Sequence, residues 1–248
     1  MSVDVHAGYA LMVLLGAIVM LAFPLTRDLR SSAERRSYYV IQGITLLGAL
    51  VGAKFAVLMG DALWPLQPYH DWPQLLVSGR SIAGALLFGF LTAELAKPLL
   101  GYRLPPNDRF AVILPISIGI GRIGCLLAGC CQGLPYSGWG AMRDAAGVLR
   151  HPAPVYEMVF QFAFAALLWQ LYRHGRLQHR LFALYLIGYG VFRFASEFLR
   201  DTAKAFAGYS AYQWMALMMV VLGAITLWLR SPAREDPQAQ LQMKGASR

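Results

Sequence analysis

Seven stretches of predominantly apolar residues follow one another along the chain, and short segments that carry most of the charges separate them. They cover residues 8–25, 38–59, 75–100, 110–131, 153–172, 181–199 and 211–229. A helix needs roughly 20 mostly apolar residues to cross the hydrocarbon core of a bilayer. The pattern therefore predicts an all-α integral membrane protein, a single bundle of seven transmembrane helices over residues 1–230. A polar cytoplasmic tail at 231–248 is expected to follow it.

The distribution of basic residues predicts the orientation of this bundle. Lysine and arginine are concentrated in one alternate set of inter-helix segments, which carries fourteen of them against four in the other set. By the positive-inside rule, the N-terminus lies outside and the C-terminus lies in the cytoplasm. With 57% hydrophobic and only 14% charged residues, the chain does not fit a soluble class. The net charge of +9 thus reflects topology, and no nucleic-acid partner is expected.

The sequence GIGRIGCLLAGCCQG closes the fourth apolar stretch and places an arginine, Arg122, in a hydrophobic setting. An arginine there costs at least ~2.5 kcal/mol on the most lenient insertion scale, so a partner must hold it. Glycines at 119, 121, 124 and 129 leave more than one helix face open to a neighbouring helix or a ligand. This stretch is predicted to form the floor of a site for an anionic group.

The alternating helix directions bring further charges into the outer half of the bilayer. The predicted set is Lys54, Arg80, Arg122, Arg193, Glu157 and Glu197. Four cations against two carboxylates leave two positive charges, which require a partner when buried. At that depth the natural anion is a phospholipid headgroup. Arg193, Glu197 and Arg200 also share one helix face by their spacing, so a structural charge ladder is the alternative for these three.

The three cysteines fall within the fourth stretch at Cys125, Cys130 and Cys131. An odd number inside one membrane helix does not form a secreted disulfide framework. No CxxC spacing or nearby histidine supports zinc, and adjacent cysteines on a helix point in different directions. We therefore interpret them as small packing residues and expect no metal and no cofactor. Tyr9, near the outer surface, is typical of an interfacial belt.

Several of these motifs together resemble those of the prolipoprotein diacylglyceryl transferase family. They are GIGRIGCLLAGCCQG, the following HPAPVYE, the GAK of the second stretch, Tyr9, and FRFASEFLRD. The resemblance covers essentially the whole membrane region and implies seven spans in the bacterial inner (cytoplasmic) membrane. It also implies transfer of a diacylglyceryl group from phosphatidylglycerol to the lipobox cysteine thiol of a prolipoprotein, with release of glycerol phosphate. The expected partners are phosphatidylglycerol or another anionic phospholipid, a prolipoprotein lipobox peptide, and the bilayer.

The resemblance assigns roles to residues of this sequence. The family's Gly-Arg-hydrophobic-Gly motif corresponds to Gly121, Arg122, Ile123 and Gly124, and its closing glycine corresponds to Gly133. Arg122 and Arg193 would hold the phosphate or its developing charge. The other headgroup-binding candidates are Arg80, Lys54 and Tyr9. Glu197 and Arg200 are expected as structural charge partners.

The sequence also departs from the family pattern. The family's His-Gly-Gly appears here as Ala83, Gly84 and Ala85, its asparagines as Cys125 and Ala128, and its glutamate as Cys130. A thiol acceptor attacks as thiolate, so another group must take its proton. His151 and Glu157 are the candidates for this base, Glu157 being also a potential partner of Arg193. Cys130 is a third candidate, as base or covalent relay. The alternative is a non-catalytic or differently specific phospholipid-binding protein on the same scaffold.

Overall fold

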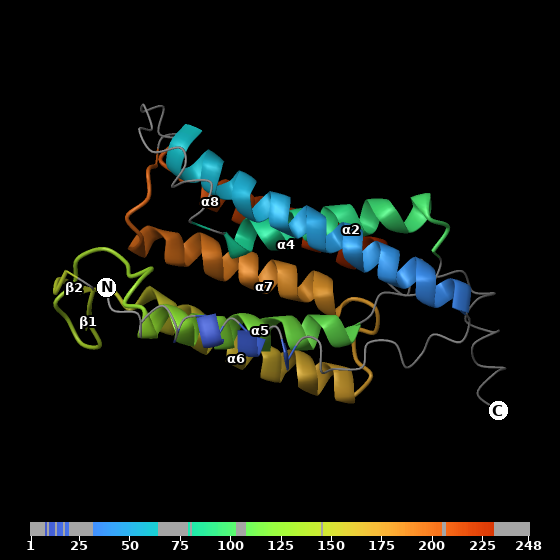
Figure 1. Cartoon of the computed structure of the whole chain (residues 1–248), viewed down its shortest axis with the longest axis horizontal. Coiled ribbons are helices and arrows are strands. Elements are labelled where there is room, and N and C mark those ends of the chain that lie inside the picture. The colour runs from blue at the N-terminus through green and yellow to red at the C-terminus, as the bar shows by residue number, and fades with distance from the viewer. Residues whose placement is uncertain are drawn as a thin grey trace.

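The computed structural model describes residues 8, 10–12, 14–16, 18–19, 32–63, 79, 81–102, 108–144, 146–204 and 207–230. In this part of the chain, long helices run along one common axis, and a small hairpin closes one end (Figure 1). The helices are α2 (Ser32–Val57), α4 (Ile82–Leu99), α5 (Asp108–Leu127), α6 (Ala153–Arg173), α7 (Leu181–Ser196) and α8 (Ala211–Leu229). A π-helical segment, η1 (Leu58–Leu63), extends α2, and a 3-10 segment, η2 (Glu197–Leu199), extends α7.

The hairpin lies between α5 and α6 and consists of two short antiparallel strands. They are β1 (Met142–Arg143) and β2 (Leu149–Arg150), with Met142 opposite Arg150. At this end of the molecule, which we call the hairpin end, α2, α5 and α7 finish and α4, α6 and α8 begin (Figure 1).

The helices confirm an all-α integral membrane protein. Five of the described helices are long and apolar enough to cross a bilayer, namely α2, α4, α5, α7 and α8. Helix α6 has 21 residues and covers the fifth predicted stretch. The structure describes the first predicted stretch only in part, and the described residues there are helical. One of them, Gly16, accepts a hydrogen bond through its carbonyl from the hydroxyl of Ser117 on α5 at 2.8 Å. The tail at 231–248 lies outside the described residues.

The predicted end of the fourth stretch was wrong. Helix α5 stops at Leu127, four residues before the predicted end, and the chain then turns through Gly129 (φ 59°) and Cys131 (φ 63°). The pattern did not show this end because Ala128, Cys130 and Cys131 are themselves apolar. Consequently Cys130 and Cys131 do not lie on the helix, and the inference that their side chains diverge there does not apply.

Close backbone contacts hold the helices in pairs, α2 with α4, α5 with α6, and α7 with α8. On α4, a Cβ atom added to Gly84 would lie 2.3 Å from the Gly52 carbonyl oxygen of α2. Small residues at such positions let two membrane helices approach closely. Helix α7 lies between the α2/α4 and α5/α6 pairs in Figure 1, and its Leu181, Tyr185 and Tyr189 are fully buried.

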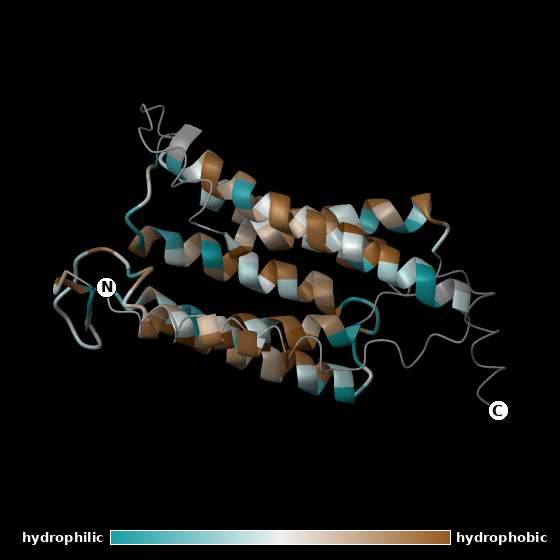
Figure 2. Cartoon of the chain, viewed as in Figure 1, coloured by the Kyte–Doolittle hydropathy of each residue, from teal (hydrophilic) through white to brown (hydrophobic). Residues whose placement is uncertain are grey.

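Polar residues gather toward the two ends of the bundle and on α7 (Figure 2). At the end opposite the hairpin, Glu94 pairs with Lys97 at 2.5 Å and with Arg230 at 2.8 Å. The Asp108 carboxylate accepts the backbone N–H groups of His179 and Leu181, where α7 begins. The charged site described below lies at the hairpin end.

Candidate functional site

A buried ion pair joins α5 to α6. Nη2 of Arg122 lies 2.7 Å from Oε2 of Glu157, whose side chain is 2% exposed. The Tyr189 hydroxyl of α7 donates to the other carboxylate oxygen at 2.8 Å. The potential pairing of Glu157 with Arg193 is not observed, because the close partner of Glu157 is Arg122 and that of Arg193 is Glu197. With both oxygens engaged, Glu157 fixes the position of the Arg122 guanidinium.

A second buried pair lies at the end of α7, where Nη2 of Arg193 contacts Oε2 of Glu197 at 2.7 Å. Oε1 of Glu197 also accepts the hydroxyls of Thr202 at 2.8 Å and Ser210 at 3.1 Å. Ser210 is the N-cap of α8, in a capping box with Gln213, which fixes its hydroxyl group. These contacts hold Glu197, and through it Arg193, in one orientation.

Arg200 joins the two pairs. The predicted helical ladder does not continue to it, because η2 ends at Leu199 and Arg200 adopts an extended backbone (φ −108°, ψ 147°). Its Nη2 lies 3.9 Å from Oε2 of Glu157. Three guanidinium groups, from Arg122, Arg193 and Arg200, therefore share two carboxylates.

Each of these guanidinium groups keeps one unsatisfied nitrogen. Nε of Arg122, Nη1 of Arg193 and Nη2 of Arg200 are buried and have no hydrogen-bond partner among the described residues. A buried donor on a charged group that lacks an acceptor is strongly unfavourable. Three guanidinium groups against two carboxylates also leave one positive charge. The arrangement is therefore suited to an anion that accepts several hydrogen bonds.

Aromatic residues extend the cluster toward α8 and η1. The Arg193 guanidinium lies 5.4 Å from the centroid of the Tyr212 ring, and the Tyr212 hydroxyl donates to Asp61 at 3.0 Å. Asp61 is exposed, at the edge of the cluster. The sequence prediction missed Tyr189 and Tyr212, because tyrosines are common in membrane helices. For Ser210 a signal was present, since Ser-x-x-Gln before an apolar run marks a capping box.

Gly133 connects the hairpin to the ends of α6 and α7. Its N–H donates to the His151 carbonyl at 2.8 Å, and the N–H of the next residue donates to the Leu199 carbonyl at 2.8 Å. A Cβ atom at Gly133 would lie 2.4 Å from that Leu199 oxygen. A larger residue would therefore displace the segment next to Arg200, which gives Gly133 a positioning role.

His151 lies two residues before α6, next to Gly133. Its ring stacks on Tyr136 at a centroid distance of 4.0 Å, and its Nδ1 is 3.3 Å from the Tyr156 hydroxyl. The side chain is half-buried, so that it combines a fixed orientation with access to solvent.

The remaining predicted site residues have varied positions. Lys54 is half-buried in the last turn of α2, and Gly124 is buried in α5. At Gly121 an added Cβ would meet no described atom within 4 Å, so that this face of α5 is open there. Tyr9 and Arg80 lie outside the described residues.

Ala83, at the place of the family's histidine, is 1% exposed and belongs to the apolar core. Its neighbour Gly84 is needed where α4 meets α2. This position therefore contributes packing to the helix bundle and no titratable group.

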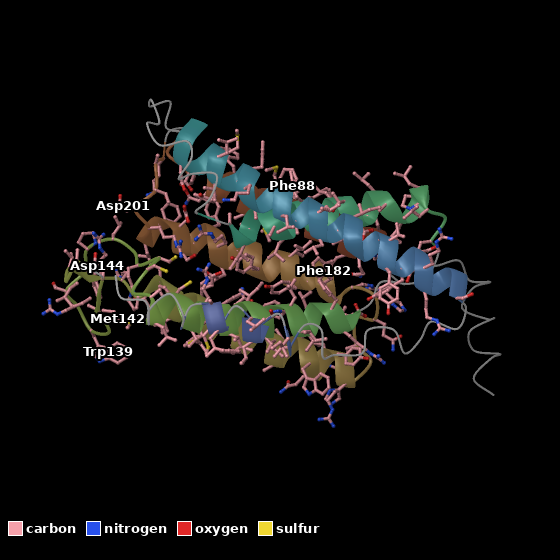
Figure 3. The ribbon with its side chains drawn as sticks, viewed as in Figure 1. Phe88, Trp139, Met142, Asp144, Phe182 and Asp201 are labelled. Atoms are coloured by element: carbon pink, nitrogen blue, oxygen red, sulfur yellow. The ribbon has the colours of Figure 1, made fainter. Side chains whose placement is uncertain are left out.

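The hairpin covers the same end of the bundle. Figure 3 shows its labelled residues Trp139, Met142 and Asp144 at the end where Asp201 also lies. Asp144 accepts the N–H groups of Ala146 and Val148 at 2.9 Å and contacts Nε of Arg150 at 2.5 Å. Its hydrogen bond with Arg150 and those from the backbone lower the pKa of the Asp144 carboxyl.

Comparisons with known proteins identify the family of this chain. The sequence profile described as prolipoprotein diacylglyceryl transferase matches residues 2–229. A phosphatidylglycerol–prolipoprotein diacylglyceryl transferase of Cupriavidus pinatubonensis is 28% identical over 98% of this chain and 97% of its own length. Proteins of the same name from Nitrosospira multiformis and Teredinibacter turnerae are each 30% identical. The alignments cover 89% and 98% of this chain and 78% and 91% of the relatives.

Proposed function

The chain belongs to the prolipoprotein diacylglyceryl transferase family, and we propose that it transfers a diacylglyceryl group from phosphatidylglycerol to the lipobox cysteine thiol of a prolipoprotein. It is thus an enzyme, and the predicted family resemblance is confirmed. One observation carries the assignment of the site: three largely buried guanidinium groups, each with a buried nitrogen that lacks a hydrogen-bond partner among the described residues. A phosphate diester offers several acceptor oxygens and a negative charge, and the planar fork of arginine matches this geometry.

The proposed reaction is a displacement at the glycerol carbon that carries the phosphate ester. The thiolate sulfur forms a C–S bond to this carbon while the C–O bond to the phosphate breaks. The electron pair of that bond leaves on oxygen, as glycerol phosphate. Arg122, Arg193 and Arg200 would stabilise the charge that develops there, which is where electrostatic catalysis contributes most.

The thiol proton requires an acceptor, for which we propose His151. Both oxygens of Glu157 are engaged, by Arg122 and by Tyr189, whereas the His151 ring is half-buried and makes no ion pair within the described part of the chain. Glu157 is then a positioning residue for Arg122. Cys130 stays a third candidate, as a base or relay.

The membrane arrangement is part of the same proposal. We infer seven spans in residues 1–230, with the site in the outer half of the bacterial inner membrane, the N-terminus outside and the tail 231–248 in the cytoplasm. The excess of basic residues in the segments away from the hairpin end supports this orientation.

Thin-layer analysis tests the activity directly. Purified protein is incubated with phosphatidylglycerol labelled in its acyl chains and with a synthetic lipobox peptide. Label should move to the peptide, and glycerol phosphate should appear in equal amount. A peptide with serine in place of its cysteine is the control. Lipid retention without any transfer would instead favour the phospholipid-binding alternative.

A further inference from the structure

The turn that ends α5 brings three sulfur atoms together. The Sγ atoms of Cys125, Cys130 and Cys131 all lie within 4.8 Å of one another, and those of Cys130 and Cys131 are 3.4 Å apart. The N–H of Cys130 donates to the Cys125 carbonyl at 3.1 Å, which folds the turn back over the helix end. Cys125 is buried, whereas Cys131 is exposed, so the cluster reaches from the protein interior to the surface.

We propose that these three cysteines form a binding site for a thiophilic cation, namely Cu(I). Thiolate sulfur lies about 2.3 Å from a bound metal of this type, so three sulfurs around one ion are separated by about 4 Å. The sulfur atoms are already in this range, and small side-chain rotations would complete the site.

The composition of the site favours Cu(I) over other metals. Thiolates are soft ligands and select Cu(I), zinc and iron–sulfur clusters. A structural zinc site takes four ligands, but among the described residues no histidine or carboxylate joins the three sulfurs. Three thiolates without a fourth ligand suit a monovalent soft ion.

A positive charge beside the cluster offsets the negative charge of the thiolates. Nη1 of Arg122 lies 3.7 Å from the Cys125 sulfur. A bound Cu(I) ion would therefore compete with Arg122, an arginine of the proposed phosphate site, for the sulfur of Cys125. This contact couples the metal site to the proposed transferase site, although binding of the metal itself depends only on the three sulfurs.

Equilibrium binding of Cu(I) to the full-length protein tests the proposal. The reduced protein in detergent is titrated anaerobically with Cu(I) against a chromophoric Cu(I) chelator, and the copper bound per chain is measured after desalting. One Cu(I) per chain is expected, with sulfur ligands alone at about 2.3 Å by X-ray absorption. Cys125→Ser, Cys130→Ser and Cys131→Ser should each weaken binding at least tenfold.

Leu127→Ala is the matched control, because it changes the same helix end without removing a sulfur, and it should bind copper as the parent does. Elution of each variant as the parent does on size exclusion shows that it is folded. Failure of the parent to bind Cu(I), equal binding by a variant without the three cysteines, or displacement of Cu(I) by equimolar Zn(II) would overturn the proposal. Since none of these measurements uses lipid transfer, they are independent of the proposed function.

Discussion

At the scale of single residues, the site consists of arginines that are only partly neutralised. Removing one partner from a buried ion pair costs roughly 3–5 kcal/mol, because the remaining charge stays desolvated. Glu157 and Glu197 are the partners that neutralise Arg122 and Arg193 and hold them in place. Three buried donor nitrogens of the arginines nevertheless have no hydrogen-bond partner among the described residues. The structure thus keeps the arginines oriented while leaving hydrogen-bonding capacity for an anion, which we propose to be the phosphate of the lipid.

Arg122→Ala and Arg193→Ala should each abolish phosphatidylglycerol binding and transfer, because each removes a cation from the phosphate site. The corresponding lysine variants should restore little, since an ammonium group lacks the planar fork. Binding of spin-labelled phosphatidylglycerol and peptide labelling measure the two effects. Extraction of a folded bundle at the parent level controls for misfolding. Unchanged lipid affinity in both alanine variants would refute the headgroup site.

His151→Ala should slow transfer by roughly 10²–10⁴-fold, the usual cost of losing a general base. Lipid affinity should stay as in the parent, because the Arg122–Glu157 pair is intact. Glu157→Gln should instead change lipid affinity as well, since it leaves Arg122 without its counter-charge. The ratio of transfer rate to lipid affinity separates the two roles. Equal transfer by the His151 variant and the parent would remove His151 as the base.

At the scale of elements, the apolar pattern predicted where helices lie better than where they end. The predicted seventh stretch coincides with α8, whereas α5 ends at Leu127 inside a run that is still apolar. The pairing of Glu157 with Arg122 depends on which helices are neighbours, and a sequence alone does not contain that information. Arg122 and Arg193 could be predicted, because a charge in an apolar stretch needs a partner wherever that partner lies.

Gly84→Ala should destabilise the contact between α4 and α2. The added Cβ would lie 2.3 Å from the Gly52 carbonyl oxygen and 2.4 Å from Cβ of Ala56, so the helices must separate. Overpacking of this kind costs about 1–3 kcal/mol, which should lower the midpoint of thermal unfolding in detergent. Gly43→Ala is the matched control, because its Cβ would meet no described atom within 4 Å. Equal midpoints for the two variants would contradict this account of the contact.

The β1–β2 hairpin should loosen at acidic pH. The folded pKa of Asp144 is lowered by Arg150 and two backbone N–H groups. Its contribution is therefore complete above the unfolded pKa of about 3.9 and is lost as the pH falls below it. Pepsin cleavage in the hairpin, normalised to an unstructured peptide, should accelerate over this range. Asp144→Asn should be cleaved quickly throughout it. A pH profile that is the same for parent and variant would exclude Asp144 as the cause.

At the scale of the whole molecule, the bundle has two chemically different ends. The hairpin end carries the arginine cluster together with exposed apolar residues such as Trp139, which is 98% exposed. The opposite end carries basic residues at or just after the ends of α4, α6 and α8, namely Lys97, Arg173, Arg176 and Arg230. A site that binds a phospholipid headgroup must open at one membrane surface, and the positive-inside rule supports our proposal that this surface is the outer one.

The proposed seven-span arrangement makes a prediction about the two termini, because an odd number of spans places them on opposite sides of the membrane. A fluorescent protein fused after residue 248 should fluoresce in the cytoplasm, whereas alkaline phosphatase fused there should be inactive. Phosphatase inserted between Gly138 and Trp139, at the hairpin end, should be active, because that end faces outward. An insertion at His174, in the turn after α6, is the control on the opposite side and should be inactive. Phosphatase activity both after residue 248 and in the hairpin would contradict the odd number of spans proposed between these two positions. Activity at His174 with none in the hairpin would reverse the orientation and place the arginine cluster toward the inner leaflet.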